Sequence, residues 1–169
     1  AVLGYDPAQA RYADVRDVDQ ALVTPGVVIY RLDDRLFFAN ATWTKQRLGE
    51  AIAGAPYPVE WVVFNAEAVT HIDSTGAAML EDVVVELREQ GITFTIARPK
   101  SRARRRLRES GITTLIGEQH VYPTVHASVE AYAAPRDDVE ADEVPLPKDG
   151  SVPAGPSPDG DDETGDHAS

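Results

Sequence analysis

One short run, Asp73-Ser74-Thr75-Gly76, holds the residue types that could bind or receive an anionic group. It lies between an apolar segment and an amphipathic one, so Ser74 is predicted to be the N-cap of a helix. The free amides and the positive dipole end of that helix would favour a phosphate beside Ser74 or attached to its hydroxyl. An ordinary N-cap serine without a ligand fits the same spacing. Both interpretations indicate a regulatory or structural position more than a catalytic one.

A basic run at residues 98–108 is the second candidate site, since it holds seven of the 14 Lys and Arg residues found in residues 1–134. On a predicted helix, Arg102, Arg105 and Arg106 share one side. Ala103 and Leu107 face the core. We expect the three arginines to contact acidic groups of anionic lipid, of an acidic protein partner or of the same chain. A solvated helix face without a partner is the alternative.

Enzyme chemistry finds little support in the sequence. There is neither a glycine-rich phosphate loop followed by Lys nor a G-x-G-x-x-G motif. The four histidines lack metal-ligand spacing, and the absence of cysteine excludes thiol chemistry and disulfides. His71, Asp73 and Ser74 lie on one turn, where they do not easily align as base, orienting group and nucleophile. We therefore expect no enzyme activity, no metal and no cofactor.

The charge of the chain is divided unevenly along its length. The net charge is −12 at pH 7. Residues 1–134 hold 17 acidic and 14 basic residues, a mildly acidic balance that argues against nucleic-acid binding. Residues 135–169 hold 11 acidic residues, two basic ones and six of the twelve prolines, which predicts a disordered acidic tail. No apolar run approaches the ~18 residues of a membrane span, and the start at Ala1 indicates an excised piece of a longer protein.

The segments around the two candidate sites alternate between strand and helix patterns. This alternation implies an α/β fold with right-handed crossovers and mostly parallel strands, the first strand being an antiparallel edge. In the first helix, Trp43 and Leu48 are expected to face inward, and residues 112–116 are expected to be an irregular turn. The expected strands are residues 11–15, 27–32, 59–65 and 92–97, and the expected helices are residues 40–53, 75–90, 101–111 and a last one after Thr124.

Two stretches together resemble the STAS domain (sulfate transporter and anti-sigma-factor antagonist). The first is the strand, the turn Ile72-Asp73-Ser74-Thr75-Gly76 and the helix after it. The second is residues 25–32 followed by Leu-Phe-Phe-Ala-Asn-Ala at 36–41, which looks like the version attached to bacterial sulfate permease (SulP) transporters. The resemblance covers about residues 10–134, and it makes residues 1–9 a linker that follows a transmembrane domain.

The resemblance implies a small mixed sheet of about 4–5 strands with helices mainly on one side. It also implies a non-enzymatic regulatory domain at the cytoplasmic face of the cell membrane, soluble itself but part of an integral SulP-type transporter of sulfate or another anion. The implied partners are the transmembrane domain of the same transporter, a second copy in a homodimer and a weakly bound nucleotide of the GTP or ATP class, with no nucleic acid. The residues implied for anion or nucleotide binding are Asp73, Ser74, Thr75 and Gly76.

The alternative that the resemblance leaves open is a stand-alone anti-sigma-factor antagonist. In such proteins the serine at the position of Ser74 is phosphorylated, and the phosphate controls partner binding. This chain has Asn65 where the antagonists often have Asp, and its long acidic C-terminal segment also departs from them.

Overall fold

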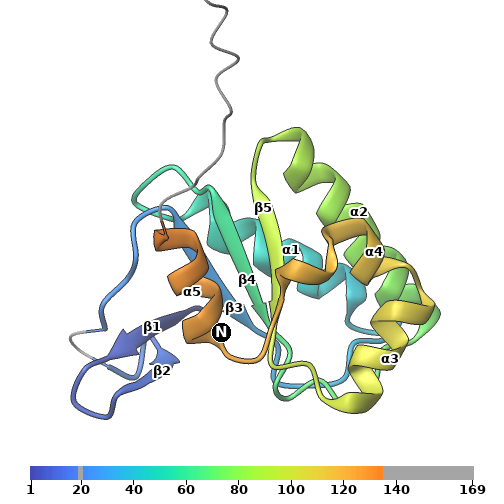
Figure 1. Ribbon diagram of the computed structural model, residues 1–169, viewed down its shortest axis with the longest axis horizontal. Coiled ribbons are helices and arrows are strands. Elements are labelled where there is room, and N and C mark those ends of the chain that lie inside the picture. Colours follow the sequence, from blue (N-terminus) through green and yellow to red (C-terminus); the bar gives the residue numbers. More distant parts are fainter. Residues whose placement is uncertain (19–20, 135–169) are drawn as a thin grey trace, which may run out of the picture. The chain divides into compact units, whose positions relative to one another are not determined.

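A four-stranded parallel sheet in the order β3-β4-β5-β6 forms the centre of residues 1–18 and 21–134, which the computed structural model describes (Figure 1). Three predicted strands are confirmed as β3 (Val27–Arg31), β4 (Trp61–Asn65) and β5 (Thr93–Ala97). The two-residue strand β6 (Val121–Tyr122) was not predicted, because two residues carry no alternating pattern. The acidic tail expected at 135–169 lies outside the described residues.

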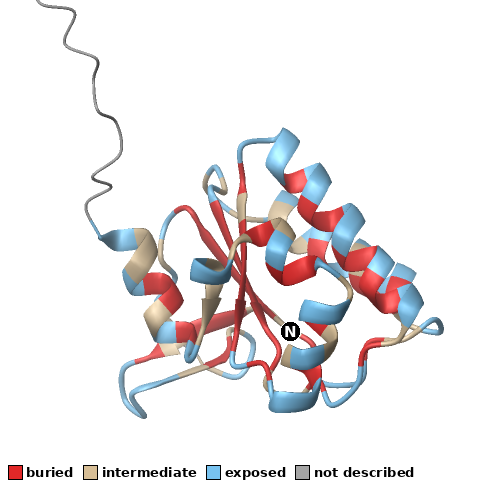
Figure 2. Cartoon of the chain, turned by 45° about the vertical axis from the view of Figure 1, so that its right-hand side comes forward, coloured by how far each residue is buried: buried red, intermediate tan, exposed pale blue. Residues whose placement is uncertain are grey.

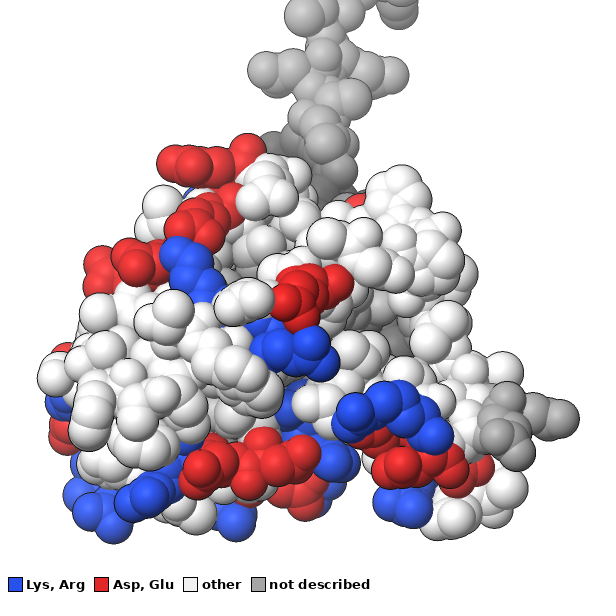
Figure 3. Space-filling view, turned by 180° about the vertical axis from the view of Figure 1, so that it is seen from behind, with Lys and Arg blue, Asp and Glu red and all other residues white. Residues whose placement is uncertain are grey.

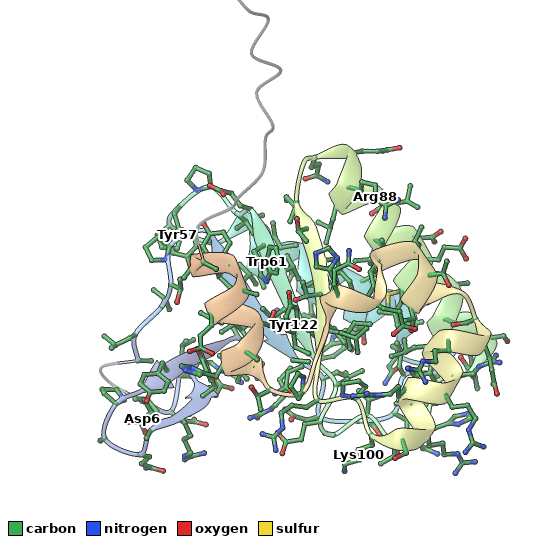
Figure 4. All side chains as sticks on the ribbon, in the orientation of Figure 1. Asp6, Tyr57, Trp61, Arg88, Lys100 and Tyr122 are labelled. Atoms are coloured by element: carbon green, nitrogen blue, oxygen red, sulfur yellow. The ribbon has the colours of Figure 1, made fainter. Side chains whose placement is uncertain are left out.

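The helices cover the two faces of the sheet unequally, with four on one face and one on the other (Figure 1). Side chains of a strand alternate between the faces, so Val62 and Phe64 of β4 face the larger helical layer. Trp61 and Val63 face the smaller one, where the Trp61 indole donates to the Ser128 hydroxyl at 3.2 Å (Figure 4). The larger layer consists of α1 (Ala41–Ala53), α2 (Ser74–Glu89), α3 (Ser101–Glu109) and α4 (Ile112–Ile116), and α5 (Val125–Ala133) forms the smaller one.

Helix α2 turns one apolar stripe toward the sheet, as its sequence predicts, and the buried stripes of the helices are visible in Figure 2. Leu80, Val83 and Leu87 are buried, and Gly91, with φ of +73°, follows the helix end. The start of α2 is packed just as closely. A Cβ on Gly76 would lie 2.7 Å from the Leu36 carbonyl oxygen, so only glycine fits where α2 meets this segment.

Two expectations about the helical layer are wrong. Trp43 is 55% exposed, and Thr44 takes the inward place in α1 with 1% exposure. The helix begins at Ala41, so the buried stripe runs through Ala41, Thr44 and Leu48 at i, i+3, i+7. Residues 112–116 form α4 and not an irregular turn, because Gly111 adopts φ of +81° and lets the chain restart a helix after α3.

The first nine residues differ from the expected linker. Strand β1 (Leu3–Asp6) pairs antiparallel with β2 (Arg11–Asp14), and the bridge from Val2 to Tyr30 joins this hairpin to the edge of β3. The Arg31 amide donates to the Ala1 carbonyl at 2.8 Å. The Arg31 amide at this edge is thereby paired, which favours extended chain beside it. In the described part of the chain, no helix has the length and apolar character needed to cross a membrane.

Candidate functional site

Asp73, and not Ser74, is the N-cap of α2. One carboxylate oxygen of Asp73 accepts the Gly76 amide at 2.7 Å, and the other accepts the Phe38 amide at 2.9 Å. The hydrogen bond from the Gly76 amide is the main cause that lowers the pKa of the Asp73 carboxyl below its ordinary value, and the bond from the Phe38 amide lowers it further. The prediction for Ser74 was wrong because a carboxylate offers two acceptors and can satisfy two separate amides.

Ser74 is therefore the first residue of α2, and its side chain is exposed. Its hydroxyl makes no side-chain hydrogen bond to any residue that the structure describes, and the neighbouring Thr75 is also exposed. Gly76 contributes less than predicted, since it is buried and its amide is already bound by Asp73. Of the four predicted residues, Ser74 and Thr75 are the two that an incoming group could reach directly.

The structure brings the two predicted sites together. A hollow of about 470 Å³ lies between the Asp73–Ser74 turn and α3. Both helices begin at the edge where the parallel strands end, α2 after β4 and α3 after the neighbouring β5, and ligands of such sheets bind at this edge. Lys100, just before α3, marks this edge in Figure 4. The lining residues are His71, Ile72, Asp73, Ser74, Arg102, Arg105, Arg106 and Glu109.

Positive charge in the hollow is only partly neutralised. Arg106 lies 4.0 Å from Glu109, whereas Arg102 and Arg105 form no ion pair within residues 1–18 and 21–134. Glu67, which does not line the hollow, is paired with Arg98 at 2.8 Å. Seen from behind, Lys and Arg side chains lie along the lower edge of the domain, with Asp and Glu side chains among them (Figure 3). The hollow therefore suits an anionic group better than the sequence around Ser74 alone indicates.

Phe38 is a neighbour of the site that the sequence analysis did not single out. Its amide is bound by Asp73, and its ring is 72% exposed. The ring of Phe37 packs edge-on against it, with centroids 5.6 Å apart. Exposed aromatic rings are typical of protein contact surfaces, and the paired phenylalanines just before a helix start were the available signal.

The groups that line the hollow decide which chemistry it could support. His71 is exposed and lies beside Asp73, whose two carboxylate oxygens each accept a backbone amide. Within the described residues, no group of three or more His, Asp or Glu side chains could hold a metal ion. The guanidinium groups of Arg102, Arg105 and Arg106 are the type of donor that binds phosphate and sulfate groups in proteins.

Comparison with known proteins places this geometry in a family. The family model described as "STAS domain" matches residues 20–128. A probable sulfate transporter of Mycobacterium tuberculosis strain H37Rv is 38% identical over 132 residues, which are 78% of this chain and 24% of the transporter. The chain thus spans about a quarter of the length of the curated relatives that it matches first.

Solved structures with the same fold come from two kinds of protein. The STAS domain of a SulP transporter from Vibrio cholerae has a TM-score of 0.56 and 25% sequence identity, covering 68% of this chain and 86% of that domain. The anti-sigma factor antagonist SpoIIAA in its unphosphorylated form has a TM-score of 0.54 and 19% identity, covering 66% of this chain and 92% of that protein. The second likeness is one of fold alone.

Proposed function

This chain belongs to the STAS domain family, and we propose that it is the cytoplasmic regulatory domain of a SulP-type transporter of sulfate or another anion. The 38% identity to a probable sulfate transporter supports the transporter assignment. The domain itself catalyses no reaction. It acts by contact with the transmembrane domain of the same protein at the cytoplasmic face of the cell membrane, and in the complete transporter it forms a homodimer.

One observation carries the regulatory part of the proposal: the exposed Ser74 lines the same hollow as Arg102, Arg105 and Arg106. An anion or a nucleotide phosphate that enters the hollow meets these guanidinium groups and the α2 N-terminus together. A phosphate added to Ser74 itself would bring about −1.5 to −2 charges to the same place. In both cases the bound charge ties α2 to α3 and changes the surface that a partner meets around Phe38.

Sulfate uptake by the complete reading frame that contains this chain tests the proposal. We expect removal of the domain to abolish or alter uptake. Arg102→Gln, Arg105→Gln and Arg106→Gln combined should change its regulation, while the protein level in the membrane stays the same. Uptake that is unaffected both by the triple variant and by removal of the domain would refute the regulatory role.

A stand-alone anti-sigma-factor antagonist switched by Ser74 phosphorylation is the second candidate, and the exposed Ser74 hydroxyl favours it. The SpoIIAA likeness adds the fold only. At the position where antagonists often have Asp, Asn65 is 3% exposed, and its side-chain oxygen accepts the Glu67 amide at 3.1 Å. The reading frame ahead of Ala1 separates the candidates, since a transporter requires a series of apolar spans there.

A further inference from the structure

A second basic hollow flanks α3 on a face that does not include Ser74. Its volume is about 480 Å³. Ser101, Arg104, Arg105 and Arg108 recur at i, i+3, i+4 and i+7, so they share one side of the helix. Lys100 and Pro99 complete the lining. Arg105 lines both hollows, so this face adjoins the side of α3 that carries Arg102 and Arg106.

The charges on this face lack partners within the domain. Lys100, Arg104 and Arg105 form no ion pair with any described residue, and only Arg108 does, to Glu118 at 3.5 Å. The first turn of α3 has no acidic residue, and its N-cap makes no side-chain hydrogen bond. Cations at a helix N-terminus are unfavourable because the dipole there is already positive. The basic side chains at this uncapped helix start repel one another, and an external anionic surface would reduce that repulsion.

We infer that this face of α3, formed by Lys100, Arg104, Arg105 and Arg108, docks on anionic phospholipid headgroups. The inference rests on the proposed function, which places the domain beside a membrane. The Ala1 carbonyl accepts a hydrogen bond from the amide of Arg31, the last residue of β3. Ala1 therefore lies at the carboxyl-terminal edge of the sheet, where α3 also begins. A membrane domain joined ahead of Ala1 would thus hold this edge near the lipid surface.

Charge pattern favours lipid over other polyanions. Clusters of four to eight Lys and Arg residues are typical of contacts with anionic membranes, and α3 with Lys100 holds six. Residues 1–134 have 17 acidic against 14 basic residues, so the rest of the domain would repel an extended nucleic acid. A flat bilayer can meet one basic helix without touching the acidic surface elsewhere. An acidic protein is the competing occupant, and the vesicle experiment below distinguishes it from lipid.

Binding of the 169-residue chain to vesicles at low salt tests the inference directly. We expect the chain to sediment with vesicles that contain phosphatidylglycerol and not with pure phosphatidylcholine vesicles. Each charge near an anionic surface contributes about 1 kcal/mol, or about fivefold in affinity. The variant Lys100→Gln, Arg104→Gln and Arg105→Gln should therefore bind on the order of 100-fold more weakly, and high salt should release the unmodified chain.

A matched control removes the same net charge elsewhere. Arg11, Arg35 and Arg47 are exposed and lie outside α3, so the variant with Gln at all three should bind nearly as the unmodified chain does. No binding to anionic vesicles would overturn the inference and favour an acidic protein as the occupant. Equal binding to neutral and anionic vesicles, or an equal loss in the control, would also overturn it, because the binding would then not depend on this basic face. The vesicle assay does not measure uptake. Lipid docking can therefore be refuted while the regulatory role in transport stands, and the regulatory role can be refuted while lipid docking stands.

Discussion

Replacing Gly76 by alanine tests how tightly the site is built. At an open helical position this change stabilises a protein by about 0.5–1 kcal/mol, because alanine is the better helix former. At Gly76 the new Cβ would meet the Leu36 carbonyl oxygen at 2.7 Å and the Leu36 Cγ at 2.8 Å. The backbone at Leu36 cannot move away without a loss of stability, and overpacking of this kind destabilises a protein by about 1–3 kcal/mol. We therefore expect a net loss of about 1–2 kcal/mol in the free energy of unfolding.

Gly49→Ala is the matched control, since Gly49 lies in α1 with no atom within 4 Å of a built Cβ. It should raise the free energy of unfolding by about 0.5–1 kcal/mol. Thermal and urea unfolding followed by circular dichroism measures both variants. A Gly76→Ala protein as stable as Gly49→Ala would refute the close approach of α2 to Leu36, and with it the geometry that positions Asp73.

Three further predictions concern other residues. Thr44→Val should raise the free energy of unfolding by about 1 kcal/mol in urea titrations, because the buried Thr44 hydroxyl has no hydrogen-bond partner among the described residues. Hydrogen bonds from Arg16 lower the pKa of Asp14 from 3.8 to about 2, so the stability from this pair is complete above about pH 4 and lost as the pH falls toward 2. Asp14→Asn should accordingly lower Tm at neutral pH and leave it nearly unchanged near pH 2, and equal losses at both would contradict the pairing. Ser74→Glu should alter uptake by the complete transporter with little change in Tm, whereas Ser74→Ala should transport like the unphosphorylated protein; wild-type uptake in both would reduce Ser74 to a structural residue.

The parts of the fold that follow from repeated patterns could be predicted from the sequence. The α2 stripe with Leu80 and Leu87 repeats over three turns, and β4 is a continuous apolar run, so each indicates its structure without tertiary information. Short or tertiary-dependent elements could not be predicted. Strand β6 has two residues, and β1 forms because β2 supplies its backbone partners.

The chemistry of the site was predicted in pieces, and the structure joins the pieces. Both Ser74 and the arginines were candidates, but residues near 74 and near 105 meet only through the order of β4 and β5 in the sheet. The sequence also did not reveal that Asp73, and not Ser74, is the N-cap of α2. This role of Asp73 depends on Phe38, an amide 35 residues earlier that Asp73 accepts along with Gly76. Local spacing cannot reveal such a partner.

The central claim is that the hollow between Ser74 and α3 receives an anion. Titration of the isotopically labelled 169-residue chain with inorganic phosphate, and then with a nucleotide, measures this by amide chemical shifts. We predict that the largest shifts occur at residues 74–77 and on α3, that binding is weak, and that Gln at positions 102, 105 and 106 removes the shifts. Largest shifts elsewhere in the chain, or shifts that persist unchanged in the triple variant, would contradict the account.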